Sequence, residues 1–134
     1  MTTREELARR CETIEQAYEF MLAYAAQGLS GEAASGTGGQ LRDLLSRAAA
    51  ALDDIGDEYR LLVKSEDLDP RIRYNAFIDV LERDANAALA AIQLVLAQPS
   101  ISSQLVDNLT ASTHVRALLT DLFLIDEILK SVPS

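Results

Sequence analysis

The side chains that could bind a metal or a haem are few in this chain. It has one histidine, His114, and one cysteine, Cys11, and Met21 is the one methionine beyond the first residue. A di-iron site in a helical bundle requires two Glu-x-x-His motifs, and the residue three positions before His114 is Ala111. A zinc site requires several N or S ligands. We therefore expect no metal, haem or other cofactor.

Carboxylates are the other side chains with catalytic potential. Asp53, Asp54, Asp57 and Glu58 form a dense run, which the spacing of the apolar residues around them places on the outer face of a helix. A run of this kind is the ordinary solvated surface of a helix. No Ser/His/Asp or Cys/His set can be named either. The sequence thus predicts a protein that is not an enzyme.

The neighbours of Cys11 at helical spacing are apolar. A thiol in such a position is a small core residue, because a reactive cysteine needs a polar, partly exposed environment. We expect Cys11 to be buried and unreactive.

Composition narrows the class of protein and of partner. The chain has 134 residues, of which 49% are hydrophobic and 25% charged, and this predicts a single folded domain over 1–134. A net charge of −9 without a basic cluster excludes a nucleic-acid partner. The most apolar stretch, 85–97, is shorter than the roughly 20 residues that cross a bilayer, so we expect no membrane partner and a cytoplasmic location.

Apolar residues recur at helical spacing through four segments, less regularly in the last, so the fold is predicted to be all-α. The expected helices cover 3–27, 38–64, 70–97 and 101–131. Capping-box spacings, in which a hydroxyl and an acid or amide side chain satisfy free backbone amides, precede the first two: Thr3 with Glu6 and Thr37 with Gln40. Pro70, after Asp69, is predicted to begin the third helix. Gly56, inside the second helix, indicates that another backbone packs closely there, unless the glycine is simply tolerated, and we favour the close packing.

The connections between these helices are too short to run the length of the bundle. Neighbouring helices must therefore be antiparallel, which predicts an up-down-up-down four-helix bundle. The fourth helix carries two apolar faces that differ in orientation, separated by the polar residues Ser112, Thr113 and His114. We expect a kink or break over 110–114.

The third and fourth helices carry more apolar residues than one buried face requires. The residues outside the core spacing, which form the candidate interface, are Leu89, Leu94, Leu96, Leu119 and Phe123. Three explanations remain open: a broad monomer core, a homodimer that buries the second face, and a groove for another protein's helix or an apolar ligand.

The sequence therefore favours a non-enzymatic bundle that acts through protein–protein interaction as an adaptor, assembly factor or regulator, and as a homodimer. The alternative is a bundle that binds a small molecule in an apolar cavity between its helices. The candidate lining of that cavity is Tyr18, Tyr24, Tyr59 and Tyr74.

Overall fold

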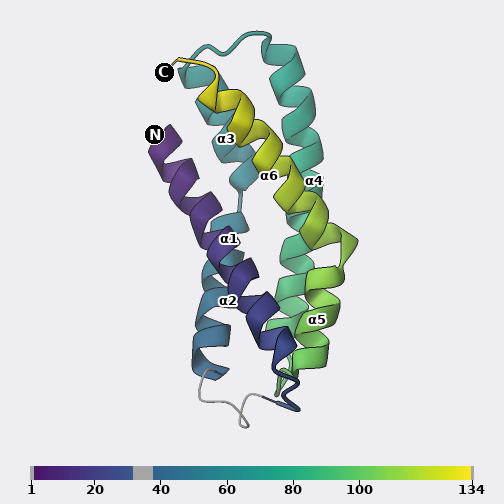
Figure 1. The fold of residues 1–134 in the computed structure, drawn as a ribbon. Coiled ribbons are helices and arrows are strands. Elements are labelled where there is room, and N and C mark those ends of the chain that lie inside the picture. Colours follow the sequence, from purple (N-terminus) through teal and green to yellow (C-terminus); the bar gives the residue numbers. More distant parts are fainter. Residues whose placement is uncertain (1, 32–37, 134) are drawn as a thin grey trace.

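The computed structural model describes residues 2–31 and 38–133, and every regular element in them is a helix (Figure 1). The helices are α1 (Arg4–Ala26), α2 (Gly38–Leu52), α3 (Ile55–Ser65), α4 (Arg71–Leu96), α5 (Ser103–Ala111) and α6 (Thr113–Lys130). The all-α prediction is confirmed. The expected count of four is corrected to six, because the segments 38–64 and 101–131 are each interrupted.

The first interruption lies at Asp53 and Asp54, between α2 and α3. Asp54 has a φ of 54°, in the left-handed region that Asp tolerates better than most residues. Arg10 of α1 donates hydrogen bonds to the Asp53 carbonyl (3.1 Å) and to Oδ1 of Asp54 (3.2 Å). Leu52 and Ile55 on either side stay buried. The sequence predicted that the acidic run lies on the outer face of one continuous helix. The structure corrects this, because the run spans the break between α2 and α3.

The second interruption was predicted. Ser112 has a ψ of 134°, which is not helical, and it both ends α5 and caps α6. Its Oγ accepts a hydrogen bond from the amide of His114 at 3.2 Å. Thr113 and His114 are exposed in the first turn of α6. The expected irregularity over 110–114 is confirmed at Ser112.

The ends of the other helices test the capping residues that the sequence predicted. Thr3 and Glu6 form the predicted capping box at the start of α1. Pro70 precedes α4 at the N-cap position, so the helix begins at Arg71, one residue later than expected. Thr37, and with it the second predicted capping box, lies outside the described residues, as does 32–37 of the connection after α1.

Side chains at the predicted core spacing form one apolar core. α1 packs on α2 and α5, and α4 packs on α2, α3 and α6. The two ends of the chain lie at the same end of the molecule (Figure 1). There the guanidinium of Arg4 in α1 pairs with Glu66 (2.7 Å) after α3 and donates to the carbonyls of Leu129 and Val132 (both 2.7 Å) at the end of α6. Arg4 thus ties three elements together.

At the other end of the molecule, Ser103 at the start of α5 holds the end of α1. Its hydroxyl donates to the carbonyl of Tyr24 at 2.6 Å and accepts from the amide of Leu29 at 2.8 Å. The Tyr24 hydroxyl donates to the carbonyl of Ile101 at 2.7 Å. Over the described ranges, no helix is long and apolar enough to cross a membrane.

Candidate functional site

The five residues of the candidate interface do not form one surface. Leu119 is buried in the core at 6% exposure, which corrects the expectation that it faces outward. Leu89 and Leu96 are half-buried against the core. They follow Glu82 at steps of seven residues, so they share the flank of α4 on which Glu82 binds Arg60 of α3.

The two remaining members, Leu94 and Phe123, are well exposed, but on different helices and sides. Phe123 lines a shallow hollow between α1 and α6 with Tyr18 and Leu119. Leu94 lies near the end of α4. Neither extends a surface formed by Leu89 and Leu96.

The four tyrosines of the alternative prediction are also not brought together. Tyr18, Tyr59 and Tyr74 line three separate hollows. Tyr24 is fully buried in the core. The arrangement gives no support to a single tyrosine-lined cavity.

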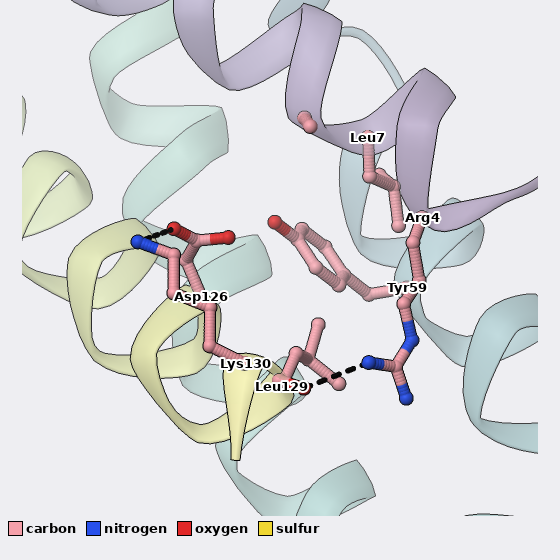
Figure 2. A pocket seen from close by; sticks show the side chains of 7 residues that line it. Arg4, Leu7, Tyr59, Asp126, Leu129 and Lys130 are labelled. Atoms are coloured by element: carbon pink, nitrogen blue, oxygen red, sulfur yellow. Dashed lines mark hydrogen bonds and ion pairs between the residues drawn. The ribbon is translucent and has the colours of Figure 1, made fainter. Parts of the chain in front are cut away.

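The hollow at Tyr59 lies between α1, α3 and α6 (Figure 2). Its volume is about 170 Å³, and its wall includes Arg4 and the ion pair between Lys130 and Asp126 (3.4 Å). The Tyr59 hydroxyl points into the space between α1 and α6, and it lies 3.4 Å from Sγ of Cys11, as hydrogen-bonding partners do. This volume is smaller than the roughly 300–1,000 Å³ of ligand pockets.

The pKa values of Cys11 and Tyr59 are raised, which disfavours the ionised, nucleophilic form of each group. Burial is the largest cause that raises the pKa of the Cys11 thiol and the pKa of the Tyr59 hydroxyl. A nucleophilic cysteine needs the opposite shift, because the thiolate is the reactive form. The prediction that Cys11 is buried is confirmed. The pair packs and hydrogen-bonds in the core, where neither group is activated.

A different surface combines apolar character with exposure: the groove between the first half of α4 and the second half of α6. It encloses about 250 Å³. Apart from the guanidinium of Arg73, its lining is apolar or aromatic. The lining residues are Pro70, Arg73, Tyr74, Phe77, Ile125 and Ile128.

Helical spacing extends the two helix faces that form the groove beyond its lining residues. On α4, Arg73, Phe77, Val80 and Asp84 are spaced by four, three and four residues, so they share one helix face. On α6, Ile128, Leu124 and Asp121 are spaced by four and three. We call these seven residues the α4/α6 face. Leu124 (50%), Ile128 (39%) and Val80 (36%) are exposed large apolar side chains on it.

Two carboxyl groups meet at the inner end of this face. Asp121 of α6 is 9% exposed, and its Oδ2 is buried without a hydrogen-bond partner. The pKa of Asp121 is raised to about 7, first by burial and then by the hydrogen bond and the charge of Asp84 on α4. The two groups can hydrogen-bond once one of them holds a proton. When both are ionised, a buried negative charge is left without a donor.

The α4/α6 face could have been found in the sequence. Arg73, Phe77, Val80 and Asp84 each precede by one residue a member of the predicted core seam of α4, which contains Tyr74, Ile78, Leu81 and Ala85. The sequence-based interface was instead drawn from the strongly apolar stretch at 85–97, in the second half of the helix. That Asp84 meets Asp121 had no sequence signal, because it depends on the register of α4 against α6.

Among the residues described by the structure, no group of three or more His, Cys, Asp or Glu side chains could hold a metal ion. Comparison of the chain with models of protein families, with curated proteins and with solved structures finds no match.

Proposed function

We propose that this chain is a non-enzymatic bundle that acts through protein–protein contact, and that it forms a homodimer through the α4/α6 face. The observation that carries the proposal is the exposure of Val80, Leu124 and Ile128 around an apolar groove. Large apolar side chains gathered in this way are typical of an interaction surface, and a symmetric pair is the commonest assembly of soluble chains.

The packing favours this explanation over the other two. A broad monomer core would have buried Val80, Leu124 and Ile128, and it buries Leu119 but leaves these three exposed. A small-molecule site would enclose its ligand, and the groove is open and about 250 Å³ in volume, below the usual range for such sites.

We also propose that the fold is an antiparallel four-helix bundle. In this view α2 and α3 together form one interrupted helix of the bundle, and α5 and α6 form another. The burial of Leu52 and Ile55 across one interruption, and of Leu109 and Val115 across the other, supports this view. The acidic composition and the single cysteine fit the cytoplasm, which we propose as its compartment.

The test is analytical ultracentrifugation of the wild type and of two matched variants. Leu124→Glu places a carboxylate on the proposed interface in each copy. Leu61→Glu makes the same change at a leucine of equal exposure (50%) on α3, away from the face. We expect the wild type to sediment as a dimer and Leu61→Glu to resemble it. Leu124→Glu should weaken dimerisation by about 100-fold, because a buried unpaired charge costs several kcal/mol.

Circular dichroism of both variants checks that they remain helical. A monomeric wild type at micromolar concentration contradicts the proposal. Equal effects of Leu124→Glu and Leu61→Glu would contradict the assignment of the interface to α4 and α6.

A further inference from the structure

We propose that the second copy lies antiparallel across the α4/α6 face, so that Arg73 of each copy enters beside Asp84 and Asp121 of the other. This inference rests on the proposed dimer and gives it an orientation and a polar contact. It assigns to Asp84 and Asp121 the role of a receptor for a guanidinium supplied by the second copy.

The charges on one chain are complementary to themselves. Asp121 brings to the inner end of the face a buried oxygen, Oδ2, that has no donor. At the other end of the same face, Arg73 is exposed and forms no ion pair within the described chain. By contrast, Arg60 on α3 reaches both Glu82 (2.8 Å) and Asp79 (2.7 Å) of α4. The guanidinium of Arg73 and the partly buried carboxyl group of Asp84 thus lie on one surface.

One two-fold axis across α4 would bring both pairs of opposite charges together. Arg73 and Asp84 are eleven residues apart on one helix, or about 16 Å at 1.5 Å per residue. An axis that crosses α4 between Phe77 and Val80 places Arg73 of each copy opposite Asp84 of the other. The same axis places Phe77 opposite Val80, so apolar side chains meet in the middle of the interface and opposite charges meet at its ends.

A parallel arrangement of the same two faces is disfavoured by charge. It would place Arg73 against Arg73 and the carboxyl pair of one copy against that of the other. Like charges brought together at an interface cost several kcal/mol, so they select against this orientation. The antiparallel arrangement instead pairs Arg73 with the carboxyl group of Asp84, which is only partly buried.

Disulfide cross-linking between separately purified chains tests the orientation. Arg73→Cys and Asp84→Cys are made in a Cys11→Ala background, whose fold is verified by circular dichroism. Each variant is oxidised alone and after mixing with the other. A disulfide requires Cα atoms within about 7 Å, so residues about 16 Å apart on one helix cannot join within a chain.

We expect a cross-linked dimer from the mixture and none from either variant alone. Cross-linking of Arg73→Cys with itself would show a parallel arrangement and overturn the inference. Absence of cross-linking in the mixture would overturn it as well. In both cases a dimeric wild type leaves the proposed function standing, whereas a monomeric wild type removes both.

A charge reversal gives a second measurement that needs no oxidation. Arg73→Glu should raise the dimer dissociation constant by about 10-fold to 100-fold, because it turns each attraction into a repulsion. Arg83→Glu makes the same change on the exposed side of α4, outside the face, and should have little effect beyond the shared change in net charge. Equal effects of the two reversals would overturn the role of Arg73.

Discussion

Gly56 of α3 lies against the side chain of Glu82 of α4 with no room for a methyl group between them. A Cβ at position 56 would lie 2.9 Å from Cβ of Glu82 and 2.7 Å from its Oε2. The sequence predicted close packing of another backbone at Gly56; the packing is close, but the neighbour is the side chain of Glu82. The contact places Glu82 where Arg60 of α3 can bind it.

Gly56→Ala is expected to destabilise the fold, although Ala is the better helix former by about 1 kcal/mol. Cβ of Glu82 cannot move without the backbone of α4, so we expect a net loss of about 1–2 kcal/mol, measured by urea unfolding. Gly39→Ala in α2 is the matched control, because nothing lies within 4 Å of its added Cβ. It should leave stability unchanged or raise it by up to about 1 kcal/mol. Equal responses would show that α3 and α4 can separate at low cost.

Asp121 is expected to make the stability of the folded monomer fall as pH rises. Its pKa is raised from 3.8 to about 7 in the folded chain, so the folded state binds this proton more tightly than the unfolded state does. The free energy of unfolding should therefore decrease between pH 3.8 and about 7, by at most about 1.4 kcal/mol per pH unit. Asp121→Asn should remove this slope and be more stable than the wild type above pH 7.

The slope is measured by urea unfolding at a protein concentration well below the dimer dissociation constant. Asp107→Asn, at an exposed position of α5, is the control and should keep the slope of the wild type. If Asp121→Asn also keeps it, the carboxyl pair does not hold a proton at neutral pH.

Cys11 is expected to resist thiol reagents in the native state. It is 8% exposed, and burial raises its pKa, so both access and thiolate formation are suppressed. Labelling should be slow in buffer and complete within the mixing time after unfolding in guanidinium. The rate at intermediate denaturant reports the opening of α1. Rapid labelling of native protein would show that α1 is loosely packed over Tyr59.

The helical fold and its core followed from the spacing of apolar residues. The predicted seam across 38–64 contains seven residues, and all are buried: Leu41, Leu45, Ala48, Leu52, Ile55, Tyr59 and Leu62. Burial follows this pattern because a helix returns to the same face every 3.6 residues, whatever it packs against. The break at Ser112 was predictable for the same reason, because the two apolar faces beside it differ in orientation.

The break at Asp54 could not be predicted from the spacing of apolar residues. The apolar spacing runs through it without a gap, and Leu52 and Ile55 are buried on both sides. A single residue in the left-handed region interrupts the helix, while the apolar side chains on both sides of it stay in the core. The contacts of Arg10 with Asp53 and Asp54 come from α1, more than forty residues away in the sequence.

The sequence by itself determined which residues of α4 are buried in the core, and only the tertiary structure decided what its two flanks face. Leu89 and Leu96 share the flank of Glu82, which binds Arg60 of α3, while Phe77 and Asp84 lie toward α6. Periodicity defines the central stripe of a helix, and residues on either flank of that stripe have equivalent spacing. The neighbouring helices, placed by the packing of the whole chain, made one flank a half-buried contact and left the other as an open groove ending at Asp121.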